Sequence, residues 1–260
     1  MAAILVDIDG VLHVSGEPIP GAAEGIERLR TDGHALRFVT NNTTRARARL
    51  AEELSAIGVP IEEHEIETTP LFAGKRLAGQ KVLALVMAAI RPDLERNTTL
   101  VDAGADAVLL GGADETDETE RVFSYPNLSR AFAELEDGAR LVCLHRNRWW
   151  QTAQGPLLDA GAFVAGLEYA AGVDAEVVGK PTRAYFEAAL SELGAEPAQA
   201  VMVGDDIEAD IGGAKAIGMR AVLVRTGKFR KDTLAFAEQK PDAVLDSIAD
   251  LPDWLGEGAA

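Results

Sequence analysis

The sequence opens with a short apolar run that ends in two acidic residues. Ile4-Leu5-Val6 is followed directly by Asp7-Ile8-Asp9-Gly10. An apolar run bounded by glycine predicts a buried strand, and carboxylates two residues apart would share one face at its exit. Buried carboxylates repel each other and lose hydration, so they need a cation or a proton between them. Considered alone, so short a pattern favours a strand that ends in a solvated acidic turn, and the rest of the sequence reverses this preference.

Strands and helices alternate along the flanking parts of the chain. Near the amino end the pattern predicts a hairpin, a helix, a strand and a helix at residues 11–18, 20–32, 35–39 and 45–57. Similar elements return at residues 182–193, 200–203, 207–217, 220–224 and 243–245. This order predicts a parallel sheet with right-handed crossovers. The predicted fold class is therefore α/β, with a doubly wound, Rossmann-like parallel sheet.

The middle of the chain has short elements of its own. The apolar pattern predicts strands at residues 81–87, 107–110 and 140–145 and helices at residues 127–135 and 163–171. Acidic residues 113–121 predict a loop. We interpret this stretch as a second α/β unit inserted into the first. The predicted core domain covers residues 1–74 and 175–260, and the inserted domain covers residues 75–174.

Charge and composition limit the partners. The chain has 260 residues, and its 42 acidic and 25 basic residues leave a formal charge of −17, which argues against nucleic-acid binding. An anionic substrate should therefore meet a local positive site that contains a metal, although a saline habitat would also explain the acidity. The single cysteine, Cys143, precludes an intrachain disulfide. Without a signal peptide or an apolar stretch of membrane length, we expect a cytoplasmic protein with no membrane partner.

Polar side chains follow three of the predicted strands. Asp7, Thr40 and Asp205 each lie at a carboxyl end, and such ends border the ligand crevice of a doubly wound sheet. Carboxylates suit Mg²⁺, whereas Thr40 and Lys180, which stands at a helix start, suit phosphate oxygens. A carboxylate can also attack phosphorus and form an aspartyl-phosphate.

Four segments in order resemble the motifs of the haloacid dehalogenase (HAD) superfamily. They are Asp7 to Leu12, Thr40-Asn41, Gly179-Lys180-Pro181, and Gly204-Asp205-Asp206 with Asp210. The insertion resembles the C2-type cap of subclass IIA, which contains NagD-like and 4-nitrophenylphosphatase-like enzymes. Residues 37–41 and 177–181 are similar to the branch that contains phospholysine phosphohistidine inorganic pyrophosphate phosphatase and HAD-like hydrolase domain-containing proteins.

The resemblance implies roles for the acidic residues. Asp7 would be the nucleophile, and Asp9 would be the general acid and then the general base. Mg²⁺ would lie between the Asp7 carboxylate, the Asp9 backbone carbonyl and Asp205. Asp210 would orient the motif lysine or a metal-bound water. For Asp206, an outer-sphere role and plain helix capping stay open.

The resemblance assigns the transferring phosphoryl group to three further residues. Thr40, the Asn41 backbone and Lys180 would hold this group and stabilise its charge. Thr40 could instead serve only as a helix cap, or do both. Lys180 alone would be a solvated lysine, and its Gly-Lys-Pro setting favours the functional role.

The implied function is a Mg²⁺-dependent phosphatase acting on a small phosphorylated metabolite, pyrophosphate or a phosphoramidate. Two alternatives stay open: a non-catalytic regulatory module that binds phosphate and Mg²⁺, and a phosphotransferase using the same intermediate. A dehalogenase is disfavoured, because such enzymes lack the acid/base residue at the position of Asp9. The physiological substrate is not predicted.

One stretch of the insertion combines cations with aromatic side chains. Residues Arg146 to Trp150 could form a substrate-facing surface, where arginine pairs with an anion and tryptophan packs on the leaving group. The alternative is a strand edge whose tryptophans lie in the core or in a dimer interface. A homodimer through the caps is an option that the resemblance suggests and that the sequence does not establish.

Overall fold

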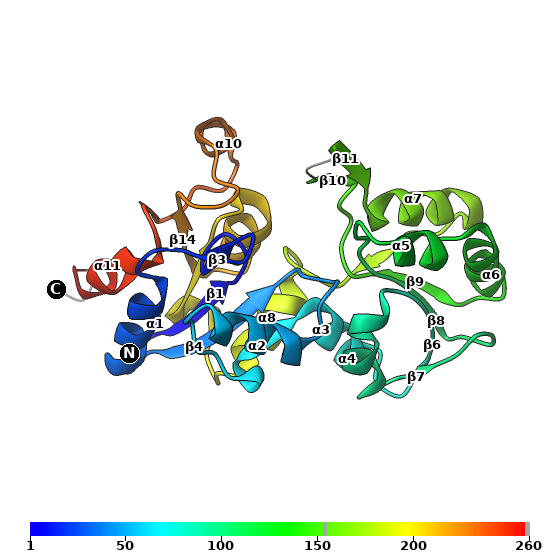
Figure 1. Ribbon diagram of the computed structural model, residues 1–260, viewed down its shortest axis with the longest axis horizontal. Coiled ribbons are helices and arrows are strands. Elements are labelled where there is room, and N and C mark those ends of the chain that lie inside the picture. The colour runs from blue at the N-terminus through cyan, green and yellow to red at the C-terminus, as the bar shows by residue number, and fades with distance from the viewer. Residues whose placement is uncertain (153–154, 258–260) are drawn as a thin grey trace. The chain divides into compact units, whose positions relative to one another are not determined.

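The computed structural model describes residues 1–152 and 155–257, and the chain forms two compact units (Figure 1). The first unit consists of Met1–Thr40, Ala48–Glu67 and Lys180–Ala260, and the second of Asn41–Arg47 and Thr68–Gly179. Each unit contains its own cluster of buried hydrophobic residues. The predicted domain boundaries, after residues 74 and 174, stay a prediction.

The first unit is built on a six-stranded sheet in the order β15-β14-β13-β1-β4-β5. The strands are β1 (Ala3–Asp7), β4 (Ala35–Thr40), β5 (Ile66–Thr68), β13 (Ala200–Gly204), β14 (Arg220–Val224) and β15 (Ala243–Leu245). Strand β1 pairs in parallel with both β4 and β13, and β14 pairs in parallel with β13 and β15. All five residues of β1 are buried, as expected for a central strand covered by helices on both faces.

Short helices and one hairpin surround this sheet. The α-helices are α1 (Ala22–Thr31), α2 (Arg47–Ala56), α8 (Arg183–Ser191), α9 (Gly213–Ala216), α10 (Lys231–Phe236) and α11 (Leu251–Glu257). A π-helix covers Ile207–Gly212, and 3₁₀ helices cover Glu63–Glu65, Pro197–Gln199 and Ile248–Asp250. The predicted hairpin is present as β2 (His13–Val14) and β3 (Glu17–Pro18).

The second unit has a five-stranded sheet in the order β12-β9-β8-β6-β7. Its strands are β6 (Lys81–Leu85), β7 (Thr99–Leu100), β8 (Ala107–Leu110), β9 (Arg140–Cys143) and β12 (Glu176–Val177). The helices are α3 (Thr69–Arg76), α4 (Arg91–Glu95), α5 (Asp117–Val122), α6 (Tyr125–Glu136) and α7 (Ala160–Ala171), with a 3₁₀ turn at Ala88–Ile90. Among the helices of the described residues, none combines the length and the apolar character needed to cross a membrane.

The loop predicted at residues 113–121 is wrong over its second half, where the structure has helix α5. The Thr116 side chain caps this helix by accepting a hydrogen bond from the Glu118 backbone N–H at 3.3 Å. Three acidic residues in the first turn complement the positive end of the helix dipole. The acidic composition that suggested a loop therefore stabilises a helix start.

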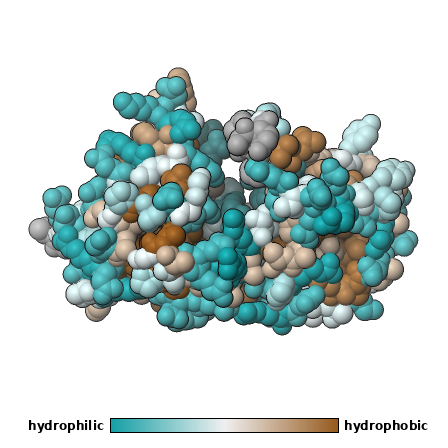
Figure 2. Space-filling view, in the orientation of Figure 1, coloured by the Kyte–Doolittle hydropathy of each residue, from teal (hydrophilic) through white to brown (hydrophobic). Residues whose placement is uncertain are grey.

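The stretch from Arg146 to Trp150 leads into a hairpin formed by β10 (Trp149–Thr152) and β11 (Gly155–Leu158). Trp149 is 56 % exposed, and its cross-strand partner Leu158 is 62 % exposed, so the core alternative is wrong for Trp149. Figure 2 shows hydrophobic side chains on the surface over this hairpin. The side chain of Trp150 lies outside the described residues, and the choice between a substrate and a dimer partner stays open.

A buried ion pair lies next to the strand that carries Thr40. The Arg37 guanidinium of β4 pairs with the Glu67 carboxylate and donates a hydrogen bond to the His64 carbonyl oxygen at 2.5 Å. Both side chains are more than nine-tenths buried. Removing one partner of such a pair leaves an uncompensated buried charge.

Arg37→Met should lower the free energy of unfolding by about 3–5 kcal/mol, because Glu67 stays buried without its cation. Adding Glu67→Leu should recover most of this loss. Urea denaturation of the two variants measures both effects. Arg49→Met is the matched control, since its pairs with Glu52 and Glu53 lie on the surface and should contribute less than about 1 kcal/mol. Equal losses at the two arginines would contradict the prediction.

Candidate active site

Three adjacent strands of the first unit end in the polar residues that the sequence singled out. Asp7 ends β1, Thr40 ends β4, and Asp205 directly follows β13. Because β1 lies between the other two strands and all three run in parallel, their carboxyl ends share one edge of the sheet. All three of these residues are buried.

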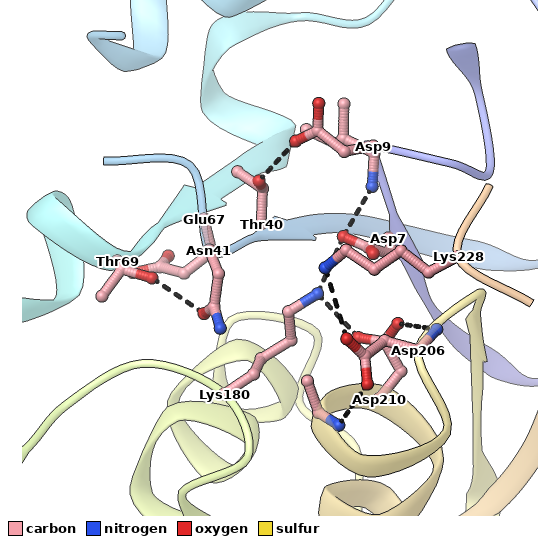
Figure 3. Close-up of polar contacts among 12 residues, drawn as sticks. Asp7, Asp9, Thr40, Asn41, Glu67, Thr69, Lys180, Asp206, Asp210 and Lys228 are labelled. Carbon is pink, nitrogen blue, oxygen red and sulfur yellow. Dashed lines mark hydrogen bonds and ion pairs between the residues drawn. The ribbon is translucent and has the colours of Figure 1, made fainter. Parts of the chain in front are cut away.

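Lys180 lies between two buried carboxylates (Figure 3). Its ammonium nitrogen is 2.7 Å from Asp7 Oδ1 and 2.7 Å from Asp210 Oδ1. Burial opposes its charge, but the two carboxylates outweigh that effect and raise the Lys180 pKa above its usual range. Lys180 therefore stays protonated and supplies a fixed positive charge beside Asp7.

The carboxylates of this cluster are held in unequal environments. Burial raises the pKa of Asp7, and the Lys180 charge opposes this rise. Burial and the neighbouring Asp7 charge raise the pKa of Asp210 to about 7. Both oxygens of Asp210 are engaged, one by Lys180 and the other by the Asp206 backbone N–H at 3.1 Å. These two contacts fit the predicted role of Asp210 in orienting Lys180, and that role stays a prediction.

Three carboxylates are close enough together to bind one cation. Ligand oxygens of Asp7, Asp205 and Asp210 all lie within 4.8 Å of one another. Asp205 Oδ1 is a buried acceptor with no hydrogen-bond partner among the described residues, whereas Asp205 Oδ2 accepts from the Lys228 backbone N–H at 2.7 Å. A hard cation such as Mg²⁺ fits an all-oxygen site of this kind and would satisfy the remaining acceptor.

Asp9 and Thr40 form a second, more open part of the site. The Thr40 hydroxyl donates a hydrogen bond to Asp9 Oδ2 at 3.2 Å. The Asp9 side chain is 51 % exposed, and Asp9 Oδ1 lies 3.7 Å from His13 Nε2 on the hairpin. A half-exposed carboxylate in this position can exchange protons with a bound group and with water. His13 was not predicted, because an isolated histidine beside a turn carries no spacing signal.

Asp206 caps the π-helix that follows it. Its Oδ1 accepts hydrogen bonds from the backbone N–H groups of Glu208 and Ala209, both at 3.0 Å. Its Oδ2 lies 3.3 Å from the Lys228 ammonium. Burial opposes the ionisation of Asp206, but Lys228 and the two backbone donors outweigh it and lower the Asp206 pKa. The structure therefore shows the capping contacts, whereas an outer-sphere role stays untested.

Asn41 differs from the other predicted residues because it belongs to the second unit. There its Oδ1 accepts a hydrogen bond from the Thr69 hydroxyl at 3.1 Å. The first unit contains the other predicted site residues, namely Asp7, Asp9, Thr40, Lys180, Asp205, Asp206 and Asp210. The catalytic roles of all eight residues stay predictions at this point.

Tyr185 is a buried residue of α8 that the sequence did not single out. Its hydroxyl accepts a hydrogen bond from the Thr40 backbone N–H at 3.2 Å. The same oxygen lies 2.6 Å from the Glu67 carbonyl oxygen and 3.1 Å from the Thr40 carbonyl oxygen, so its proton can serve either acceptor. One phenol therefore fixes the turn after β4. Helical spacing indicates only that this aromatic ring is buried and says nothing of its hydroxyl.

Comparison with known proteins identifies the family. A model of haloacid dehalogenase-like hydrolases matches residues 4–100, and a second model, described as HAD-hydrolase-like, matches residues 177–251. The chain is 39 % identical over 263 residues to the phospholysine phosphohistidine inorganic pyrophosphate phosphatase of Xenopus laevis, covering 97 % of this chain and 94 % of that protein. The chain belongs to the haloacid dehalogenase-like hydrolase family.

A second relative and three solved structures agree with this membership. Haloacid dehalogenase-like hydrolase domain-containing protein 2 of Bos taurus is 40 % identical, with 88 % of this chain and 86 % of that protein covered. The p-nitrophenyl phosphatase of Archaeoglobus fulgidus superimposes with a TM-score of 0.88 at 28 % identity, over 97 % and 98 % of the two chains. NagD of E. coli K-12 gives 0.86 at 25 % identity, over 96 % and 98 %. The magnesium complex of glycerol phosphate phosphatase from Mycobacterium tuberculosis gives 0.84 at 26 % identity, over 96 % and 76 %.

These matches confirm the predicted family and the predicted doubly wound fold class. They also fit the resemblance to NagD-like enzymes and to the pyrophosphate phosphatase branch. The family models flank the middle of the chain, between residues 100 and 177.

Tyr185→Phe should weaken the binding of inorganic phosphate by about threefold to tenfold, because the turn that carries Thr40 loses its shared hydroxyl. Mg²⁺ affinity should change much less, since the Tyr185 hydroxyl bonds to the backbone of Thr40 and Glu67, which carry none of the three clustered carboxylates. Titration with each ion, monitored by calorimetry, measures the two effects separately. A parallel loss of both affinities would indicate a general defect of the fold.

The metal-free protein should lose stability through Asp205 as the pH rises. Burial raises its pKa from 3.8 to about 6, so the folded state binds this proton more tightly than the unfolded state. The free energy of unfolding should therefore fall between about pH 4 and pH 6, by about 2–3 kcal/mol for this group. Asp205→Asn removes the effect, and in EDTA its stability relative to the wild type should rise over this window. A pH-independent difference would contradict the assignment.

Proposed function

We propose that the chain is a Mg²⁺-dependent phosphatase that forms an aspartyl-phosphate on Asp7. At the coarser level, a HAD-type phosphatase is confirmed, because the relatives and solved structures named above include several phosphatases. The observation that carries the finer proposal is the buried Asp7 carboxylate, held beside the Lys180 ammonium, with one of its oxygens within 4.8 Å of a carboxylate oxygen of Asp205. This arrangement supports the proposal, because a nucleophilic carboxylate needs positive charge beside it to approach an anionic phosphoryl group.

Mg²⁺ would be held by the carboxylates of Asp7 and Asp205 and by the Asp9 backbone carbonyl. When bound, it would offset the repulsion between the anionic nucleophile and an anionic substrate. Lys180 supplies one fixed positive charge in direct contact with Asp7. A divalent cation would add further positive charge beside this carboxylate.

In the first step, an Asp7 oxygen attacks phosphorus, and the bond from phosphorus to the leaving group breaks. Asp9 gives its proton to the departing atom and becomes a carboxylate. In the second step, Asp9 takes a proton from water as the water oxygen attacks phosphorus. The bond between Asp7 and phosphorus then breaks, so phosphate leaves and both residues return to their starting states.

Lys180, Thr40 and Asn41 would hold the transferring phosphoryl group. The Lys180 ammonium is fixed by two carboxylates and needs no reorganisation when charge develops. The Thr40 hydroxyl already contacts Asp9, so it can align the proton donor with the phosphoryl group. Residues 75–174 stay predicted as an inserted cap.

The substrate class that the relatives favour is a small phosphorylated metabolite, pyrophosphate or a phosphoramidate. Phospholysine and phosphohistidine, which appear in the name of the Xenopus laevis relative, carry P–N bonds. Cleavage of a P–N bond needs a proton on the departing nitrogen. When pyrophosphate is cleaved, the leaving group is a phosphate, whose departing oxygen also accepts a proton. Asp9 provides the required proton in both cases. A dehalogenase would have no use for such a donor.

Asp7→Asn should abolish phosphate release, with a loss of at least about a thousandfold, because the amide cannot form the aspartyl-phosphate. EDTA should abolish release by the wild type, and Mg²⁺ should restore it. The panel contains p-nitrophenyl phosphate, pyrophosphate, phospholysine, sugar phosphates, nucleotides and pyridoxal phosphate. Asp102→Asn is the matched control, since this carboxylate is 97 % exposed and lies outside the first unit.

Three results of this experiment would change the proposal. Binding of phosphate and Mg²⁺ without turnover on any substrate would favour a regulatory binding module. Transfer of phosphate to an added alcohol, in place of water, would favour a phosphotransferase. Release that persists in Asp7→Asn would exclude Asp7 as the nucleophile.

A further inference from the structure

A turn that follows β14 contacts the carboxylate of Asp205. The backbone N–H of Lys228 donates a hydrogen bond to Asp205 Oδ2 at 2.7 Å. The other oxygen, Oδ1, is buried and has no hydrogen-bond partner among the residues described. The turn therefore fixes one oxygen of the carboxylate and leaves the second available.

Two glycines enclose the same carboxylate. Gly10 follows the nucleophile segment and has φ of +85°, and Gly227 lies in the turn and has φ of +60°. A Cβ atom at either position would overlap Asp205 Oδ2. A Cβ atom at Gly227 would also lie 2.7 Å from the Gly10 Cα atom. The carboxylate thus occupies a slot between two backbone segments. The slot is wide enough only because both positions are glycine.

A side-chain hydrogen bond joins the two backbone segments that form this slot. The Thr226 hydroxyl donates a short hydrogen bond to the Gly10 carbonyl oxygen. This contact joins the turn after β14 to the loop after β1, although the two are more than two hundred residues apart in the sequence. The Lys228 backbone N–H and the two glycines thus act on the Asp205 carboxylate directly, and the Thr226 hydroxyl acts through Gly10.

We propose that Thr226-Gly227-Lys228 is a positioning element that orients Asp205 Oδ1 toward the divalent cation. This inference rests on the metal site of the proposed function and adds residues that contact neither the substrate nor the cation. A carboxylate fixed in advance loses less rotational freedom when it binds a cation, and its open lone pairs point in one direction. The main chain of Lys228 performs this role, whereas its side chain, which is 71 % exposed, pairs with Asp206.

The test compares two glycine variants by Mg²⁺ titration, with isothermal calorimetry as the readout. Gly227→Ala places a methyl group against Asp205 and should weaken Mg²⁺ binding by at least about tenfold. Gly218→Ala is the matched control, because Gly218 has φ of +89° but an added Cβ would meet no atom within 4 Å. Both variants carry the strain of a positive φ, so only contact with Asp205 separates them.

A second pair of variants tests the hydroxyl without adding bulk. Thr226→Val removes the bond to the Gly10 carbonyl oxygen and keeps the shape of the side chain, so Mg²⁺ binding should weaken by about threefold to tenfold. Thr226→Ser keeps the hydroxyl and should bind Mg²⁺ as the wild type does. Lys228→Ala keeps the backbone N–H and removes a nearby positive charge, so it should bind Mg²⁺ at least as tightly as the wild type.

The results separate this inference from the function on which it rests. Wild-type affinity for Mg²⁺ in both Gly227→Ala and Thr226→Val would overturn the positioning role and leave the proposed function intact. Loss of affinity in Lys228→Ala would assign the effect to the ammonium and would also overturn it. Should Gly227→Ala fail to fold, as judged by circular dichroism, Thr226→Val with its serine control decides the question. A wild-type protein that binds no Mg²⁺ would contradict the proposed function itself.

Discussion

The ammonium group of Lys180 is the interaction on which the arrangement of the site depends. Asp7 and Asp210 lie on different elements, and each would be costly to bury as an isolated anion. Lys180 contacts both at 2.7 Å and compensates them at once. Because the three groups are almost fully buried, removing any one of them leaves an unbalanced charge. The same buried ion pairs therefore position the site residues and stabilise the folded state.

The sheet and the turns that follow its strands position the other site residues. Parallel pairing of β1 with β4 and β13 brings Asp7, Thr40 and Asp205 to one edge. The π-helix after β13 then places Asp210 under Lys180, with the Ile211 N–H reaching back to the Asp206 carbonyl oxygen at 3.2 Å. Such single-turn π-helices occur frequently at functional sites. The parallel strands thus bring the residues at their carboxyl ends to one edge of the sheet, and the π-helix orients Asp210 toward Lys180.

Much of this arrangement could be predicted from the sequence, because it is encoded locally. The apolar run before Asp7 and the glycine after Asp9 indicate a buried strand that ends in acids, and β1 has those features. Residues 113–121 show the limit of such reasoning, since an acidic stretch fits a loop and a helix start alike. Tyr185 shows another limit. Hydrophobic periodicity predicts that its ring is buried but does not predict that its hydroxyl bonds to the Thr40 backbone.

The sequence by itself determined the fold class, the family motifs and which residue types lie at the ends of the central strands. These properties depend on short-range patterns of apolar, acidic and turn-forming residues, which are visible without coordinates. Only the tertiary structure decided that Lys228 donates its backbone N–H to Asp205, that Thr226 bonds to Gly10, and that Asp210 lies against Lys180. Those contacts join residues distant in the chain, and their geometry follows from strand order and backbone torsion, which no local pattern specifies.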